Sequence, residues 1–437
     1  MKRAYIEAAY TQVGETVFLE GWVQVIRDQK NIKFIVLRDI SGTIQVVVTK
    51  DQVQPFDALD GITLESVIAV EGLVKSVPQA PRGIEVQAEK ITILSKAAPE
   101  LPIPVVEKGE QETDQSKRLD WRWVDLRKPK NALIFKVWTA AEKAFIDYWT
   151  SNGFLEIHSP KLMSSPSESK SELFSLPYFG TTAYLAQSPQ FFKQMAMASG
   201  FEKIFEIGPV FRANPSFTSR HDTEFTGYDM EISFIESHQD VIQAESELLA
   251  HVLGSVKEKY GQEIKDVFGA ELVVPTLPFP QITMAEAKAL LKEKGVPSEK
   301  EGDLSPEEER ELSRFMTEKN GHEFLFVTEY PVEVRPFYHM RLESDPKLTK
   351  SFDLVWKGLE ITTGAQREHR YEVLKQQAED KGLNVENIQH YLNFFKFGCP
   401  PHGGLGFGPS RFIMKMLNLS NVREVTYLYR GVNRLTP

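Results

Sequence analysis

The sequence of 437 residues contains a single cysteine, Cys399, which excludes an intramolecular disulfide and indicates a reducing compartment. It has no apolar run long enough to span a bilayer, and its first residues, MKRAYIEAAY, lack the hydrophobic core of a secretory signal. Internal repeats and low-complexity tracts are absent. The pattern G-x-x-x-x-G-K-[ST] is also absent, which excludes a Walker nucleotide site. We therefore expect a cytoplasmic protein without a membrane partner.

The composition is that of a globular chain, with 41% hydrophobic and 26% charged residues. Its length predicts two or three domains. A net charge of −10 argues against a wholly basic nucleic-acid-binding surface but allows a local basic groove.

Residues 1–100 read as short strands separated by turn signals such as Asp39–Gly42. This spacing predicts a small barrel of the OB type. A proline-containing stretch and a charged stretch follow, and we assign residues 101–130 to a linker or hinge. The predicted strands are Thr16–Gln24, Lys33–Leu37, Thr43–Val48, Val67–Val74 and Ile84–Ile93.

Residues 131–437 mix strands and helices, which predicts an α+β domain on an antiparallel sheet flanked by helices. Residues 280–325 form a charged, helical, insert-like stretch. The predicted strands are Gly153–Leu162, Glu202–Val210, Thr223–Phe234, Val327–Arg335, Thr349–Trp356 and Leu359–Gly364. The predicted helices are Ala132–Thr150, His238–Lys257, Tyr371–Lys381, Asn387–Phe395 and Ser410–Leu417.

Basic and acidic residues are grouped on one predicted hairpin. Arg212, Arg220 and His221 precede a strand whose outward face carries Asp229 and Glu231. Arginine forks suit phosphate oxygens because they are planar and always charged, so this segment could hold a polyphosphate beside an amine. A solvated, salt-bridged hairpin remains the alternative reading.

A second acidic pair lies in SFDLVWKGLEITTG. A two-residue turn at Lys357-Gly358 places Asp353 and Glu360 on one face as diagonal neighbours, where Mg²⁺ would relieve their repulsion. Thr362 is expected to share this face, and Thr363 to point away. A surface acidic hairpin is the alternative.

The stretch Pro400–Arg411 is rich in glycine and precedes a helix N-terminus, where anions are favoured. By itself this turn is a weak signal. Arg411, in the first helical turn, could add charge or stack on a base.

Taken together, these segments resemble the signature motifs of class II aminoacyl-tRNA synthetases: Gly153–Leu162, Phe211–Glu231 and Gly404–Arg411. Within that class, other segments resemble the aspartyl-tRNA synthetases of the archaeal and eukaryotic kind: Tyr184–Gln194, Gln366–Arg370 and Pro400–Gly404. The resemblance covers nearly the whole chain. It implies activation of aspartate with ATP, followed by transfer to tRNA.

The resemblance also implies the roles of individual residues. Arg212, Glu360 and Arg411 would be catalytic, and Asp353, Glu360 and Thr363 would place Mg²⁺. ATP would be bound by Arg212, Asn214, Arg220, His221, Phe225, Glu360, Gly408 and Arg411. Aspartate would be bound by Glu168, Gln190, Lys193, Arg212, Asp229, Thr363 and Arg367, with Lys193 and Arg367 on its side-chain carboxylate.

In the barrel, Phe34 and Gln45 match positions that contact anticodon bases, although Phe34 could instead belong to the core. Gln24 and Pro81 match positions linked to tRNA choice. Proline at the position of Pro81 resembles the branch of the family that charges both the aspartate and the asparagine tRNA. The family further implies a homodimer, formed through Ala132–Leu162.

Asn214, Ser410 and Leu428–Gly431 depart from the family pattern. Three alternatives follow: an asparagine–tRNA ligase, a non-catalytic tRNA-binding paralogue and a metabolic amidoligase. Lys193 and Asp229 argue against the first, and intact Arg212, Glu360, Arg367 and Arg411 argue against the second. A barrel of the anticodon-binding type would have no purpose in the third.

Overall fold

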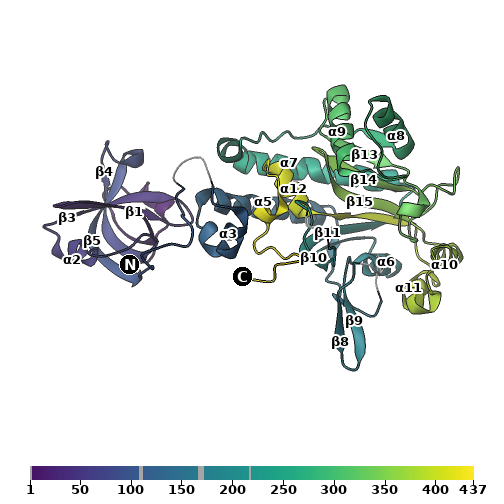
Figure 1. The fold of residues 1–437 in the computed structure, drawn as a ribbon, viewed down its shortest axis with the longest axis horizontal. Coiled ribbons are helices and arrows are strands. Elements are labelled where there is room, and N and C mark those ends of the chain that lie inside the picture. The colour runs from purple at the N-terminus through teal and green to yellow at the C-terminus, as the bar shows by residue number, and fades with distance from the viewer. Residues whose placement is uncertain (1, 108–111, 166–171, 216–217) are drawn as a thin grey trace. The chain divides into compact units, whose positions relative to one another are not determined.

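The computed structural model describes residues 2–107, 112–165, 172–215 and 218–437. The chain divides into two compact units, Met1–Leu133 and Ile134–Thr436, which we describe separately (Figure 1). Across the described ranges, no helix combines the length and the apolar character needed to cross a membrane.

The first unit is built around a closed barrel of five strands, purple in Figure 1, in the order β1-β2-β3-β5-β4. Successive strand residues point to opposite faces, so alternate side chains such as Leu19, Ile35 and Val46 fill the barrel core. All five predicted strands are confirmed. Their bounds, with those of two short helices, are β1 Thr16–Gln29, β2 Ile32–Arg38, β3 Thr43–Thr49, β4 Val67–Ser76, β5 Ile84–Ser95, α1 Ile6–Ala9 and α2 Val53–Ala58.

The end of the predicted linker is helical. Helices α3 (Gln115–Asp120) and α4 (Arg122–Asp125) lie within it. Asp114 caps α3 by accepting hydrogen bonds from the N–H groups of the first turn. Asp125 is buried and accepts a hydrogen bond from Arg122 at 2.9 Å. The chain is therefore folded, not extended, from residue 114 onward.

The second unit contains an eight-stranded sheet in the order β12-β13-β14-β15-β16-β11-β10-β6. Neighbouring strands from β13 to β10 are antiparallel, which confirms the predicted sheet, and the edge strands β12 and β6 run parallel to their neighbours. The strand bounds are β6 Leu155–Glu156, β10 Lys203–Phe211, β11 Glu224–Ser233, β12 Gln281–Thr283, β13 Phe324–Thr328, β14 Ser351–Trp356, β15 Leu359–Arg367 and β16 His402–Phe407.

One face of this sheet is covered by α5 (Pro129–Ser151), α7 (His238–Phe268) and α12 (Pro409–Met416). Tyr228 and Phe407, paired across β11 and β16, both pack on Phe145 of α5. Residues one position away along these strands must point to the other face. Asp229 and Gly406, also paired, therefore lie on the face that remains open to a ligand.

The predicted register of the β14–β15 hairpin is wrong beyond its first pair. Val355 does pair with Glu360, but the next pairs are Leu354 with Thr362 and Asp353 with Thr363. Ile361 is an extra residue that forms a β-bulge and shifts the alternation by one. Thr363, not Thr362, consequently shares the face of Glu360 and Asp353.

The glycine-rich stretch is a strand rather than a turn. Residues His402–Phe407 form β16, in the middle of the sheet. A Cβ atom on Gly404 would lie 2.1 Å from the carbonyl oxygen of Met230 and 2.2 Å from Oε2 of Glu231. The glycine is needed there because the neighbouring strand and its carboxylate leave no room for a side chain.

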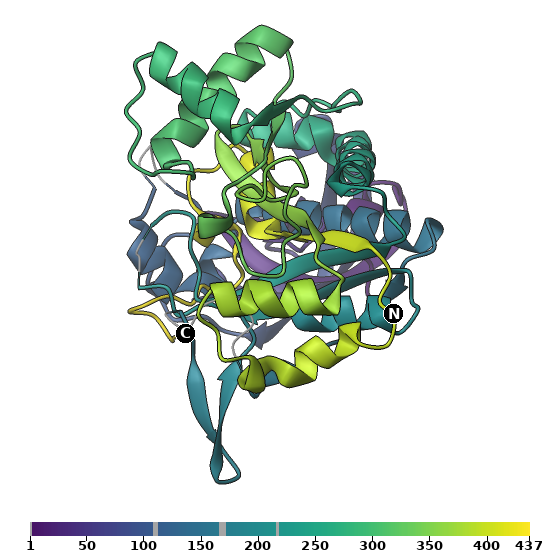
Figure 2. The same ribbon diagram turned by 90° about the vertical axis from the view of Figure 1, so that its right-hand side faces the viewer.

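Other expected elements differ in extent. The strand predicted over Gly153–Leu162 is reduced to the short β6 and to β7 (Leu162–Met163). The strand predicted over Val327–Arg335 ends at Thr328. The strand predicted over Thr223–Phe234 ends at Ser233, and Phe234 is 68% exposed beyond it. Two features were not predicted from the sequence: α6 (Gln190–Ala198), and the hairpin of β8 (Ser175–Tyr178) and β9 (Thr181–Leu185), which projects downward in Figures 1 and 2.

Helices α10 (Tyr371–Asp380) and α11 (Gln389–Leu392) follow β15, and α13 (Val422–Val425) follows α12. The insert-like stretch is helical, as predicted. Helices α8 (Met284–Glu293) and α9 (Pro306–Asn320), at the top of Figures 1 and 2, both begin with a capping box. The hydroxyl of Ser313 accepts a hydrogen bond from the N–H of Gly358 at 3.0 Å, so α9 is attached to the turn of the β14–β15 hairpin.

Glu245 is a buried carboxyl on α7, and its burial should make the stability of the fold depend on pH. Burial raises the pKa of this carboxyl to about 8, although interaction with the Thr362 side chain lowers it. In the unfolded state the Glu245 carboxyl releases its proton near its ordinary pKa of 4.5, whereas in the folded state it keeps the proton up to about pH 8. The protonated carboxyl therefore contributes to the stability of the folded state below about pH 4.5, and this contribution is lost as the pH rises to about 8. Glu245→Gln should therefore raise the free energy of unfolding at pH 8 by roughly 3 kcal/mol.

Urea denaturation at pH 6 and pH 8 measures this effect. Glu258→Gln, an exposed position on the same helix, serves as the control and should change stability at neither pH. A Glu245→Gln variant that is less stable than the unmodified protein at pH 8 would contradict the prediction.

Candidate active site

A cavity of about 750 Å³ lies on the open face of the sheet. It brings together most of the residues singled out in the sequence. The predicted residues that line it are Gln190, Lys193, Arg212, Asn214, Arg220, His221, Phe225, Asp229, Glu360, Thr363, Arg367, Gly408 and Arg411. Asp353 is buried just outside this lining, and Glu168 lies outside the described residues.

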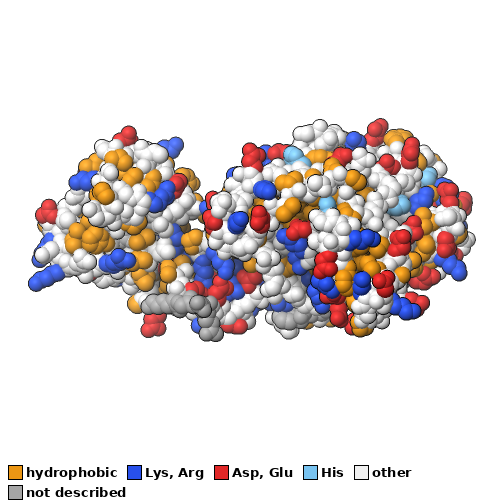
Figure 3. All heavy atoms as spheres, turned by 90° about the horizontal axis from the view of Figure 1, so that it is seen from above, with side chains coloured by type: hydrophobic (Ala, Val, Ile, Leu, Met, Phe, Trp, Pro, Cys, Tyr) orange, Lys and Arg blue, Asp and Glu red, His pale blue; other side chains and the backbone are white. Residues whose placement is uncertain are grey.

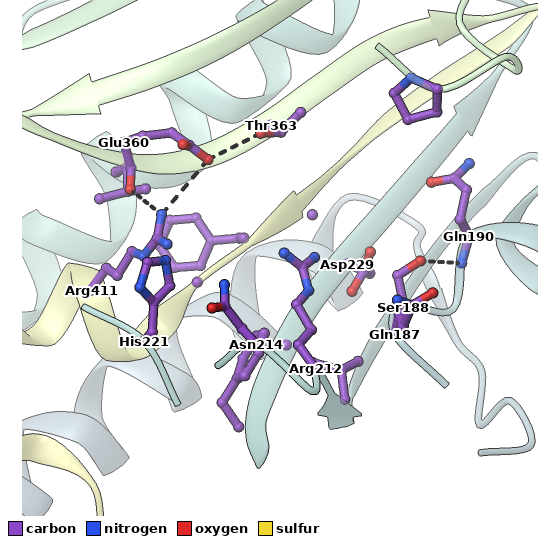
Figure 4. Close-up of a pocket in the computed structure, with 18 of the residues that line it drawn as sticks. Gln187, Ser188, Gln190, Arg212, Asn214, His221, Asp229, Glu360, Thr363 and Arg411 are labelled. Carbon is purple, nitrogen blue, oxygen red and sulfur yellow. Dashed lines mark hydrogen bonds and ion pairs between the residues drawn. The ribbon is translucent and has the colours of Figure 1, made fainter. Parts of the chain in front are cut away.

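One end of the cavity is cationic. Figure 4 shows the guanidinium of Arg212 directed into the cavity between Asn214 and Asp229, with His221 and Arg411 to one side. Burial, with Arg411 and Arg220 nearby, lowers the pKa of His221 to about 4. The imidazole is therefore neutral at pH 7, where it can donate or accept a hydrogen bond without adding charge.

Arg411 is held against the β15 strand. Its Nη1 atom donates to the carbonyl oxygen of Glu360 at 2.9 Å and lies 3.7 Å from the Oε1 atom of that residue (Figure 4). Phe225 of β11 also lines the cavity, and the Arg212 guanidinium is 5.7 Å from the centre of its ring. A planar base could stack in this region on the Phe225 ring and the Arg411 guanidinium.

The acidic pair of the β14–β15 hairpin fits a hard cation. Thr363 Oγ1 donates to Glu360 Oε1 at 3.2 Å, and Asp353 Oδ2 accepts from Arg335 at 2.7 Å. Asp353 Oδ1 is buried without a hydrogen-bond partner among the described residues, which leaves an oxygen for a metal ion. Within those residues no group of three or more His, Cys, Asp or Glu side chains could hold a metal. Mg²⁺ commonly uses only one or two carboxylates and takes its other ligands from phosphates and water.

Two cations and one acid line the other end of the cavity, Lys193, Arg367 and Asp229, and the buried Glu231 contacts both cations. Lys193 Nζ lies 2.8 Å from Asp229 Oδ1 and 3.4 Å from Glu231 Oε2, and it donates to the carbonyl oxygen of Leu405 at 2.9 Å. Arg367 Nε lies 2.9 Å from Glu231 Oε1. All four charged side chains are buried. Burial raises the pKa of Asp229, although Lys193 opposes this shift.

Two residues that contribute to this end were not predicted from the sequence. Glu231 was placed on the correct face but was not assigned to the site. His339 was not noticed, and its Nε2 atom lies 3.0 Å from Nη1 of Arg367. Because arginine only donates, this nitrogen must accept, and burial keeps the pKa of His339 well below its usual value. The only sequence signal for His339 is its place between two arginines in the stretch Arg335–Arg341, which connects β13 to β14.

The residues that depart from the family pattern also lie at or near the cavity. Asn214 and Ser410 line it. The altered segment Leu428–Gly431 contacts the start of β11, since the carbonyl oxygen of Arg430 accepts from the N–H of Thr223 at 3.1 Å. These differences from the family pattern therefore lie around the cavity, and the arginines Arg212, Arg220 and Arg411 themselves are present.

In the barrel, Phe34 is half-buried and lies outside the core cluster formed by its neighbours Ile35 and Leu37, so the core alternative is excluded. Gln45 Nε2 donates to Glu85 at 2.8 Å. Pro81 is exposed at the start of a short 3-10 turn. On the surface shown in Figure 3, basic and acidic side chains are interspersed.

Comparison with known proteins gives consistent matches for both units. Residues 114–430 match the family described as "tRNA synthetases class II (D, K and N)", and residues 17–94 match the OB-fold nucleic acid binding domain. The chain is 43% identical to an aspartate–tRNA(Asp/Asn) ligase of Aeropyrum pernix, over 97% of this chain and 96% of that protein. It is 41% identical to an aspartate–tRNA(Asp) ligase of Pyrococcus abyssi, over 97% of both.

Among solved structures, the chain is similar to an asparaginyl-tRNA synthetase of Pyrococcus horikoshii in complex with asparaginyl-adenylate. The TM-score is 0.91 at 31% identity, and all of both chains is covered.

Proposed function

Because this chain belongs to the class II aminoacyl-tRNA synthetases, we propose that it activates aspartate with ATP and transfers it to tRNA. The strongest support is that a single cavity contains both a part suited to a polyphosphate and a part suited to an acidic amino acid. Arginines 212, 220 and 411 line the part suited to a polyphosphate, and Lys193 and Arg367 lie where an amino acid with an acidic side chain would bind.

The chemistry needs no protein base, because the aspartate α-carboxylate is already ionised when it attacks the α-phosphorus of ATP and displaces pyrophosphate. Arg212, which lies between the two ends, would hold the α-phosphate and the carboxylate in line. Arg220 and the neutral His221 would bind the outer phosphates, and Phe225 and Arg411 would enclose the adenine. Asp353, Glu360 and Thr363 would hold Mg²⁺, which neutralises charge that develops on the phosphates.

Selection of aspartate is proposed to depend on Lys193 and Arg367. Their two positive charges balance Asp229 and Glu231, so a substrate that brings an ammonium to Asp229 and a carboxylate to the cations preserves neutrality. Asparagine would bring only an amide to the cations. Pyrophosphate exchange measured with each amino acid tests this directly. Exchange that only asparagine supports contradicts the proposal. If no amino acid supports exchange, the chain is better explained as a non-catalytic paralogue.

The barrel is proposed to read the anticodon through Phe34 and Gln45, and both the aspartate and the asparagine tRNA are proposed substrates. The similar ligases divide between those named for the aspartate tRNA and those named for both, so the tRNA range needs a direct test. Purified aspartate and asparagine tRNAs are charged with labelled aspartate. Comparable charging supports the broader range, and charging of the aspartate tRNA alone defeats it.

Pro81→Lys should narrow the tRNA range. The family resemblance implies that members restricted to the aspartate tRNA commonly carry tryptophan and lysine at the positions matching Gln24 and Pro81, and Pro81 is exposed. Charging of the asparagine tRNA should fall at least about tenfold, equivalent to ~1.4 kcal/mol, while charging of the aspartate tRNA is retained. Lys75→Met, at an exposed position on β4, is the control. An equal loss with both tRNAs would show that Pro81 does not discriminate.

The active form is proposed to be a cytoplasmic homodimer in which α5 and the following strand meet those of a second copy. Sedimentation at working concentration tests this arrangement, and a monomer that retains full activity would contradict it.

A further inference from the structure

A glutamate of the insert lies inside the cavity, beside one of its arginines. Glu309 Oε2 is 2.9 Å from Nη1 of Arg220, and their side chains are only 6% and 19% exposed. The same oxygen accepts a hydrogen bond from the backbone N–H of Glu360 at 3.4 Å. A carboxylate here offers Arg220 the kind of oxygen that a phosphate would offer.

The helix that carries Glu309 is firmly attached. Besides the hydrogen bond between Ser313 and Gly358, Leu312 of α9 is fully buried in a cluster that includes Leu325 of β13. The carboxylate is therefore fixed relative to the sheet. Burial raises the pKa of Glu309 to about 7, although Arg220 opposes this shift. Above that pH, an anion that binds Arg220 has to take the guanidinium from the carboxylate and then remain close to its negative charge.

We propose that Glu309 is a resident competitor for Arg220: it holds the guanidinium when the phosphate site is empty and takes it back when pyrophosphate leaves. The inference rests on the proposed function, in which pyrophosphate is the product of aspartate activation. Repulsion between the carboxylate and the phosphates weakens their binding, most strongly in a site shielded from water. Glu309 thus promotes product release.

A role limited to orienting Arg220 makes the opposite prediction. If Glu309 only positions the guanidinium for phosphate, its replacement loosens Arg220 and weakens phosphate binding. If Glu309 competes with phosphate, its replacement by an uncharged amide of the same shape strengthens binding. The sign of the change separates the two roles.

The test compares Glu309→Gln with the unmodified enzyme by isothermal titration calorimetry, using inorganic pyrophosphate and, separately, adenosine. We expect pyrophosphate to bind about tenfold more tightly to the variant and adenosine to bind equally well. The matched control is Glu307→Gln, an exposed position on the same helix, which should alter neither affinity. Pyrophosphate binding that is unchanged or weaker in Glu309→Gln overturns the proposal.

If Glu309→Gln lacks a cooperative thermal transition, Glu309→Asp, which withdraws the carboxylate by one methylene, is measured in its place with the same criteria. Aspartate-dependent exchange by the unmodified enzyme is recorded in parallel. Absence of exchange would defeat the proposed function. Exchange together with an unchanged pyrophosphate affinity in the variant would defeat only the role of Glu309.

Discussion

Arg212→Lys should lower kcat/KM for aspartate-dependent ATP–pyrophosphate exchange by about 10³-fold. Lysine keeps the charge but loses the planar fork, and a fork is what can bind a phosphate oxygen and a carboxylate at the same time. Arg212 lines the cavity between the two ends, so its proposed role is confined to the position where the reacting groups meet. The measurement is the initial rate of exchange of labelled pyrophosphate into ATP over a range of aspartate concentrations from below KM to saturation.

The control for this substitution is Arg314→Lys. Arg314 lies on α9, is half exposed and forms ion pairs only with Glu311 and Glu318 among the described residues. The Arg314→Lys variant should catalyse pyrophosphate exchange at the rate of the unmodified enzyme. Activity in Arg212→Lys within about threefold of the unmodified enzyme would mean that the bidentate contact is not used in the transition state.

Lys193→Met is the second substitution with a large expected effect. It leaves Asp229 and Glu231 buried with one cation, so we expect the free energy of unfolding to fall by about 3–5 kcal/mol. Aspartate-dependent exchange should become undetectable, because the remaining negative charge also repels the substrate. Chemical denaturation and pyrophosphate exchange measure the two effects.

A charge-balanced double variant separates stability from selection. Lys193→Met combined with Asp229→Asn removes one cation and one acid, and it should recover most of the lost stability without recovering exchange with aspartate. Lys203→Met, at an exposed position on β10, is the control and should change neither quantity. A double variant that activates aspartate normally would show that Lys193 does not contact the substrate.

Much of this arrangement could be predicted from the sequence because its signals are local. Alternation along β11 placed Asp229 and Glu231 on one face, and the five barrel strands follow from their period and turns. The register of β15 could not be predicted in this way, since the bulge at Ile361 leaves no mark in the pattern and moves Thr363 to the opposite face.

Contacts between distant segments were beyond the sequence for a different reason. His339 meets Arg367 and Glu309 meets Arg220 only after the sheet has formed, and neither pair has a characteristic spacing. A charged helical insert such as α9 looks like a solvated surface element when read alone. Its buried positions become visible only through packing against the β14–β15 hairpin.

The glycine strand β16 has a consequence for altering which amino acid this enzyme accepts. Under the amino-acid end of the cavity, the strand contributes main-chain oxygens: the carbonyl of Gly404 accepts from Arg367, and the carbonyl of Leu405 accepts from Lys193. Main-chain groups cannot be exchanged by mutagenesis, and Gly404 has no space for a larger residue. The floor of the site is therefore a constant in any redesign, and new substrate preferences have to be built from its walls on α6, β11 and β15.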